Sequence, residues 1–320
     1  MSKKTASKKF FTLLQNSSAR CIYFAQDYPK VSTMQIHHIP ELRNPIMIIA
    51  FTGWNDAGEA ASAAVDHLLE AWSVDDEAIN PVLIADLEAE DYYDFQVNRP
   101  HVLIDDSLIR EITWPNTEVF GLSIPILDRD FVVVKGVEPS MRWKSFSREI
   151  LDLADDLEVS LVITFGSLMA DVPHTRPIAV SSTGVHPDLA TRLGVEVSRY
   201  EGPTGILGVI SDGCLRRGID AVSLWAAIPH YASSAPSPKA SLSLINSLED
   251  FLDISIPSNE LPEAAEEWER EINEMSQEDS DVAQYVKALE ESKDAAELPE
   301  VSGDSIAKEF ERYLRRRPQD

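Results

Sequence analysis

Three continuous apolar runs of strand length constrain this chain most strongly: Pro45–Thr52, Leu161–Phe165 and Asp220–Ile228. Such unbroken runs are typical of strands that are buried on both faces of a sheet. A polar loop follows the first run, and the alanine-rich segment Ala57–Trp72 beyond it predicts a helix. Strands that alternate with helices predict an α/β fold in three layers, with a mainly parallel mixed central sheet between helices.

The rest of the chain extends this arrangement. Apolar runs predict further strands, at Pro81–Asp86, Glu118–Ile124, Asp130–Lys135, Ile178–Ser182 and Val195–Arg199. Apolar residues spaced by three and four positions predict further helices, at Trp143–Leu157, His186–Leu193, 206–217 and Lys239–Asp253. Residues 87–116 are rich in aromatic residues and prolines, and we expect them to form an excursion that contains strands.

Net charge is the unusual part of the composition. The 320 residues carry a formal net charge of −26, which argues against nucleic-acid binding and docking on an anionic membrane, because both need clustered Lys and Arg. No stretch approaches the roughly 18 apolar residues needed to cross a bilayer. The two cysteines, Cys21 and Cys214, give neither a disulfide framework nor a metal pair. We therefore expect a soluble cytoplasmic protein with no metal and no cofactor.

The acidity is concentrated toward the C-terminus. From Glu260 to Glu300 there are fifteen Asp or Glu residues and three basic ones, a local net charge of −12. We expect amphipathic helices with few apolar residues, the last of them mobile or bound to a partner, at Glu260–Met275, Asp281–Ser292 and Ser305–Arg316. The sequence thus predicts a disordered leader at 1–20, an α/β domain at 21–256 and an acidic helical extension at 257–320.

A polar loop after the second apolar run holds the first candidate site. We expect the strand to stop at Gly166, with Asp171, His174 and Arg176 in the loop beyond it. In α/β proteins, ligands gather at the carboxyl ends of strands. A His beside an Asp can move a proton, and the planar Arg side chain suits a carboxylate or phosphate. The alternative is structural: Arg176 forms an ion pair with Asp171, and His174 hydrogen-bonds to backbone.

Three more loops are expected at strand ends. Glu201-Gly-Pro-Thr-Gly205 places backbone N–H groups at a helix start, where they either cradle an anion or form a tight turn. Asp56 is either a general base or ligand-binding carboxylate, or a helix cap beside a Trp54 that covers the core. His230 is either catalytic or a hydrogen-bonded structural residue. Because a sheet directs such loops to shared clefts, we expect at least three of the four to line one pocket.

Four separated motifs, taken together, resemble the PAC2 family. They are Gly53-Trp-Asn-Asp-Ala-Gly58, Asp171-Val-Pro-His-Thr-Arg-Pro177, Tyr200-Glu-Gly-Pro-Thr-Gly205, and Pro229-His-Tyr231 with Pro236-Ser-Pro-Lys239. The resemblance spans about residues 40–255 and implies a fold like that of the nucleoside phosphorylases and related hydrolases. It also implies binding to other proteins, as in proteasome assembly chaperone 2, and a homo-oligomer, with a trimer preferred to a dimer.

Two functions stay open at this point. The first is a non-catalytic PAC2-type protein that binds protein partners in the manner of an assembly chaperone. The second is a phosphorylase-like or hydrolase-like enzyme, or a binder of an anion or nucleoside, with Asp56, His174 and His230 as the catalytic candidates. Both place a ligand-binding or partner-binding cleft at the strand-end loops, which contribute Trp54, Asn55, Asp56, Asp171, His174, Thr175, Arg176, Glu201, Thr204, Gly205, His230 and Tyr231.

Overall fold

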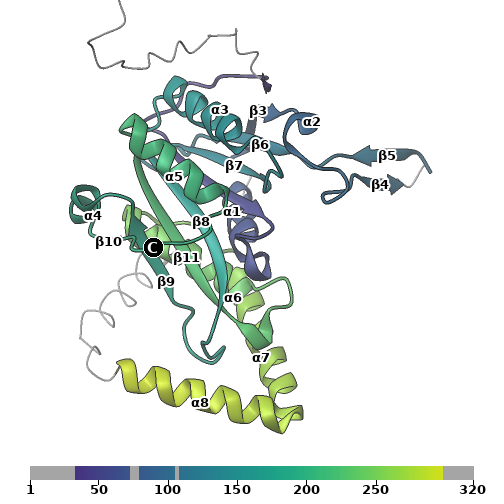
Figure 1. Ribbon diagram of the computed structural model, residues 1–320, viewed down its shortest axis with the longest axis vertical. Coiled ribbons are helices and arrows are strands. Elements are labelled where there is room, and N and C mark those ends of the chain that lie inside the picture. The colour runs from purple at the N-terminus through teal and green to yellow at the C-terminus, as the bar shows by residue number, and fades with distance from the viewer. Residues whose placement is uncertain (1–32, 73–78, 105–107, 298–320) are drawn as a thin grey trace, which may run out of the picture. The chain divides into compact units, whose positions relative to one another are not determined.

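The computed structural model describes residues 33–72, 79–104 and 108–297, whose helices and strands are shown in Figure 1. The strands are β1 (Met34–Ile36), β2 (Ile46–Thr52), β3 (Val82–Leu87), β4 (His101–Ile104), β5 (Arg110–Thr113), β6 (Thr117–Leu122), β7 (Phe131–Val137), β8 (Leu161–Ala170), β9 (Val180–Gly184), β10 (Glu196–Val197) and β11 (Asp220–Pro229). The helices are η1 (Ala57–Glu59), α1 (Ala60–Glu70), α2 (Ala89–Tyr92), α3 (Trp143–Asp156), α4 (Pro187–Leu193), α5 (Ile206–Arg217), η2 (His230–Ala232), α6 (Pro238–Leu252), α7 (Leu261–Glu278) and α8 (Ser280–Glu297).

Nine of the described strands form one mixed sheet, in the order β1-β3-β6-β7-β2-β8-β11-β9-β10. The four central strands β7, β2, β8 and β11 are parallel neighbours. Antiparallel pairs join β1, β3, β6 and β7 on one side of this centre and β11 to β9 on the other. The predicted α/β fold with a mixed central sheet is therefore confirmed.

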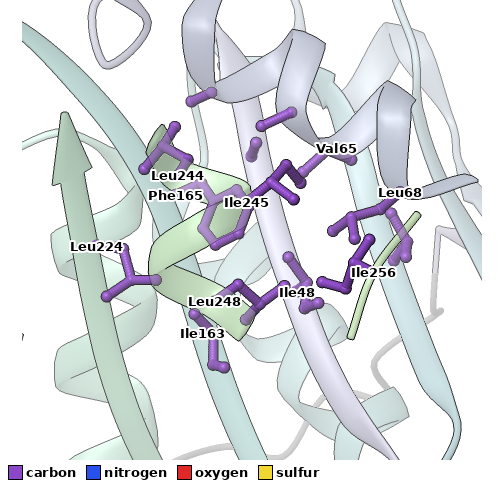
Figure 2. Packing of buried hydrophobic residues seen from close by; sticks show 14 of the residues in the cluster. Ile48, Val65, Leu68, Ile163, Phe165, Leu224, Leu244, Ile245, Leu248 and Ile256 are labelled. Carbon is purple, nitrogen blue, oxygen red and sulfur yellow. The ribbon is translucent and has the colours of Figure 1, made fainter. Parts of the chain in front are cut away.

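Helices cover the sheet on both faces because the central strands are apolar on both faces. Along β2, Ile46, Ile48 and Ala50 belong to the core under α1 and α6, whereas Met47, Ile49 and Phe51 belong to the core under α3 and α5. Alternate side chains of a strand point to opposite faces, so an unbroken apolar run serves two cores at once. Figure 2 shows the first of these cores, in which Val65 and Leu68 of α1 and Leu244 and Leu248 of α6 pack over the strands.

The predicted end of a strand at Gly166 is wrong. β8 continues through Gly166 to Ala170 and pairs with β11 over its whole length. Gly166 lies opposite Trp225, and a β-carbon on Gly166 would come within 2.6 Å of the Trp225 ring. The glycine therefore makes room for an indole on the neighbouring strand, and the polar loop begins at Asp171.

The excursion predicted at residues 87–116 contains the short helix α2 and a separate two-stranded ribbon, β4–β5. The ribbon extends away from the nine-stranded sheet (Figure 1). At its base, the rings of Phe95 and Trp114 pack edge to face with centroids 4.8 Å apart.

The acidic segment after residue 257 forms two long helices in the described part of the chain. α7 packs on the α/β layers through the buried side chains of Ala265, Trp268 and Ile272, and α8 contributes the buried Val286. The leader at 1–20 and the predicted helix Ser305–Arg316 lie outside the described residues, and the boundary near residue 257 stays a prediction. None of the described helices is long and apolar enough to cross a membrane.

Replacing Gly166 by alanine is expected to destabilise the protein by about 1–3 kcal/mol, because the added methyl group overlaps the Trp225 ring. Denaturant unfolding at an unchanged m-value measures this loss. The control is the same substitution in a Trp225→Ala background, where the ring is gone and Gly166→Ala is expected to cost almost nothing. An equal loss in both backgrounds would show that Gly166 is not needed to make room for the Trp225 ring.

Candidate functional site

The turn before α5 is filled by a carboxylate of the protein itself. Glu138, just beyond β7, accepts hydrogen bonds at Oε1 from the Asn55 side chain at 2.7 Å and from the Ile206 backbone N–H at 2.9 Å. Gly205 lies against Asn55 so closely that a β-carbon there would meet Asn55 Oδ1 at 2.2 Å. A helix N-terminus attracts an anion, and here the anion is Glu138. Glu201 and Thr204 of the same turn are exposed.

Asp56 caps α1. Its carboxylate accepts the Ala61 backbone N–H at 2.7 Å and the Ser62 hydroxyl at 2.5 Å, and Ser167 of β8 donates to it at 3.4 Å. Burial raises the pKa of Asp56, and these hydrogen bonds oppose that rise. The predicted helix cap is confirmed. The accompanying hypothesis that Trp54 covers the core is wrong, since 68% of Trp54 is exposed.

His174 is fully buried, and its hydrogen bonds fit one neutral tautomer of the imidazole. The Tyr231 hydroxyl accepts the His174 backbone N–H at 2.7 Å, so its own hydrogen is free to be donated to His174 Nδ1 at 2.8 Å. Nε2 then carries the proton and donates to Asn273 Oδ1 of α7 at 3.1 Å. Burial, the largest cause, and the nearby Lys239 charge lower the pKa of His174 below its ordinary value of 6.5. The partners of His174 are thus side chains, not the backbone groups that the structural alternative predicted.

The polar residues of the loop after β8 are bound by α8. Arg176 forms a two-point contact with Asp294, at 2.9 Å from Nε and 2.8 Å from Nη2, and lies 3.3 Å from Glu290. Thr175 donates to the same Glu290. Asp171 accepts the hydroxyl of Tyr285 at 2.8 Å, so the predicted Arg176–Asp171 ion pair is wrong. The carboxylates that hold Arg176 lie more than a hundred residues further along the chain.

Two further residues join this loop to its surroundings. The exposed His230 lies 3.8 Å from Asp171, and Tyr231 packs edge to face on both His174 and Tyr285. Burial raises the pKa of Tyr231 to about 12. At the start of α6, Lys239 donates to the His174 carbonyl and to Glu269 of α7, both at 2.5 Å.

The contacts sort the predicted residues into two groups. The first surrounds Glu138 and the start of α1 and contains Asn55, Asp56 and Gly205. The second surrounds His174 and contains Asp171, Thr175, Arg176, His230 and Tyr231. The first turn of α6 joins the two groups, because Ser237 N–H donates to Gly58 O at 2.8 Å and Lys239 binds His174 O. A single pocket lined by at least three of the four loops stays a prediction.

Several residues of the site were missed by the sequence analysis: Glu138, Lys239, Glu269, Asn273, Tyr285, Glu290 and Asp294. Of these residues, only Lys239 could have been found from the sequence, because it ends one of the four motifs. Within the part of the chain that the structure describes, no group of three or more His, Cys, Asp or Glu side chains is arranged to hold a metal ion.

This three-layer α/β fold, with its loops at the strand ends, is similar to several solved structures. A PAC2 family protein from Streptomyces avermitilis is 49% identical, with a TM-score of 0.69, and the match covers 76% of this chain and 99% of that one. A proteasome-assembly chaperone homologue from Mycobacterium tuberculosis is 45% identical, with a TM-score of 0.67 and coverage of 75% and 99%. The archaeal proteasome activator PbaB from Pyrococcus furiosus shares the fold, at 19% identity and a TM-score of 0.60, over 76% of this chain and 98% of that one.

The sequence model of the PAC2 family matches residues 50–276. The match extends over more than half of the chain, and the chain therefore belongs to the PAC2 family. No curated protein matches it.

The neutral state of His174 predicts a pH dependence of stability. The folded pKa lies below the unfolded value of about 6.5, so the unfolded chain takes up the proton first as the pH falls. The contribution of neutral His174 is therefore complete above about pH 6.5 and is lost as the pH falls toward the folded pKa. His174→Gln is expected to cost about 1–3 kcal/mol at pH ~7.5 and clearly less at pH ~5.5.

Unfolding of wild type and His174→Gln at both pH values measures the difference. Tyr231→Phe is the control, because it loses the hydrogen bond to Nδ1 but keeps the titrating imidazole. If the cost of His174→Gln does not change with pH, the stability of the fold does not depend on the neutral form of the His174 imidazole.

Proposed function

We propose that this PAC2 family protein is a non-catalytic, assembly-chaperone-like protein that binds other proteins through the surface of its strand-end loops. The observation that carries the proposal is that the loop after β8 already binds polypeptide. Arg176, Thr175 and Asp171 contact side chains of α8, and His174 contacts α7. A surface that holds its own acidic helices has the chemistry to hold a helix of a partner.

The relatives support the same direction. One structure at 45% identity is described as a proteasome-assembly chaperone homologue, and its match covers nearly the whole of that chain. We extend this description to the present protein as an assembly-chaperone-like role in the cytoplasm, with α7 and α8 covering the partner surface.

The enzymatic alternative has less support from the candidate residues. The Asp56 carboxylate is engaged by the first turn of α1, and the buried His174 has a partner at each ring nitrogen. Glu138 fills the N-terminus of α5, where a substrate anion was expected. A general base needs a substrate within hydrogen-bond reach. Asp56 and His174 are instead hydrogen-bonded to other groups of the protein.

Self-association is part of the proposal. We propose a homo-oligomer, a closed trimer in preference to a dimer, in which each copy presents the same partner surface. A closed ring requires a contact between two unlike patches of the chain.

Affinity capture with the full-length protein tests the function. We expect a protein partner at near-stoichiometric yield, and weaker capture by Arg176→Glu, which reverses the charge of the proposed surface. Capture of no protein, together with a rise in melting temperature on adding phosphate, nucleosides or acyl substrates, would favour the enzymatic alternative.

The cover formed by α8 generates a separate prediction. The pair Glu290→Gln and Asp294→Asn removes the carboxylates that hold Arg176, and is expected to speed hydrogen exchange of residues 171–176. The free energy of unfolding is expected to fall by only about 1 kcal/mol or less, because these ion pairs are partly exposed.

The control pair Glu278→Gln and Glu291→Gln removes the same charge from exposed positions of α7 and α8. Identical exchange rates in the two double variants would mean that the ion pairs of Arg176 do not hold α8 on the loop.

A further inference from the structure

The face that α8 turns toward the protein has an apolar line along its centre. Figure 1 shows α8 running across the end of the molecule where the loop between β8 and β9 lies. Val286 is buried and Val282 and Leu289 are half-buried, at the three- and four-residue spacing of one helix face. Gln284 and Glu291, on the opposite face, are exposed. Amphipathic helices that dock on other proteins present the same pattern.

Two carboxylates lie along one edge of this face and bind the cation of the loop. Glu290 and Asp294 are four residues apart, which makes them neighbours on the helix surface. Asp294 accepts hydrogen bonds from Arg176 at 2.9 and 2.8 Å, and Glu290 lies 3.3 Å from the same guanidinium. Glu290 also accepts the hydroxyl of Thr175. Because a guanidinium binds a carboxylate at two points, Arg176 favours an acidic ligand.

A tyrosine lies along the other edge. The hydroxyl of Tyr285 donates to Asp171 at 2.8 Å, and the Tyr285 ring packs edge to face on Tyr231 with centroids 6.0 Å apart. The Asp171 carboxylate accepts a donor and repels a further acidic group at this edge. The loop therefore recognises a helix that is acidic on one edge and carries an aromatic donor on the other.

The contact between α8 and the loop opens more easily than a buried one. The side chains of Arg176 and Asp294 are 32% and 52% exposed, and partly exposed ion pairs contribute little to stability. α8 nevertheless competes strongly with any separate helix, because a segment of the same chain has an effective concentration on the order of millimolar. The apparent affinity for a separate helix is reduced by the fraction of molecules in which α8 is still bound.

We propose that α8 is an internal competitor of the protein partner, and that an acidic amphipathic helix of the partner displaces it from the loop. The partner helix carries two carboxylates four residues apart for Arg176 and an aromatic hydroxyl on the opposite edge for Asp171. The occupant is a helix of this kind because the loop binds such a helix within its own chain. The inference rests on the proposed partner-binding function, and it adds the chemistry of the partner and the regulation of the site.

Binding of a labelled peptide tests the proposal. The probe is a synthetic peptide with the sequence of residues 279–297, which includes Asp279 because its carboxylate accepts the Asp281 N–H at 2.9 Å at the start of α8. The full-length double variant Glu290→Gln, Asp294→Asn is expected to bind this peptide with a Kd at least about tenfold lower than that of wild type, because its own α8 occupies the loop less. Fluorescence anisotropy measures the Kd, which is expected to rise with ionic strength.

Two further variants make the test specific. The control pair Glu278→Gln and Glu291→Gln removes the same charge from exposed positions, and is expected to bind the peptide as weakly as wild type does. Adding Arg176→Glu to the double variant is expected to abolish binding of the peptide. A peptide that carries Glu290→Lys and Asp294→Lys is expected to bind this triple variant, which would show that the triple variant is folded.

Equal Kd values for wild type and the Glu290→Gln, Asp294→Asn variant would overturn the internal competition, and so would no binding by either at about millimolar peptide. Affinity capture tests the proposed function separately. A partner that wild type and the double variant capture equally would overturn the competition alone. If neither protein captures a partner, the proposed function fails even where the peptide binds.

Discussion

The parallel pairing of β8 with β11 positions most of the candidate site. The two strands pair from Leu161 opposite Asp220 to Ala170 opposite Pro229, in an unbroken register. The next residues of the two strands, Asp171 and His230, therefore emerge side by side, and His174 meets Tyr231 a few residues later. Register is fixed because both faces of the strands are buried, and a slip by one residue would exchange the two cores. The loop geometry is thus a consequence of core packing.

A second theme is that the strand-end polar groups find partners within the chain. Glu138 supplies the anion at the N-terminus of α5, the start of α1 binds Asp56, and α7 and α8 supply Glu269, Glu290 and Asp294 to the cations Lys239 and Arg176. Partly buried polar groups must be paired, and in this protein acidic side chains do most of the pairing. Some of the many carboxylates near the C-terminus therefore serve to pair these two cations.

The apolar runs predicted the central strands because a strand buried on both faces leaves no polar gap in the sequence. The end of the strand at Gly166 was predicted wrongly from the same pattern. In a sequence, a glycine inside a strand cannot be told from a glycine that ends one until the residue on the neighbouring strand, here Trp225, is known. Which carboxylate binds Arg176 was also beyond prediction. Asp171 is close in sequence, whereas Asp294 reaches Arg176 only after two helices have folded back. Long-range pairings of this kind leave no local pattern.

The two C-terminal helices are held by different forces, and this difference links the fold to the proposed partner surface. α7 buries Trp268 and Ile272, and burying large apolar side chains contributes about 1.5–3 kcal/mol each. α8 buries only one large apolar side chain among those described, Val286, and its contacts with the loop are the partly exposed ion pairs of Arg176 and the hydrogen bond of Tyr285. Exposed ion pairs contribute about 0–1 kcal/mol. We therefore expect α8 to separate from the loop at a lower free energy than α7 does. Salt screens ion pairs but does not weaken apolar contacts in this way. A rise in ionic strength therefore weakens the contacts of α8 with the loop and leaves the packing of α7 unchanged.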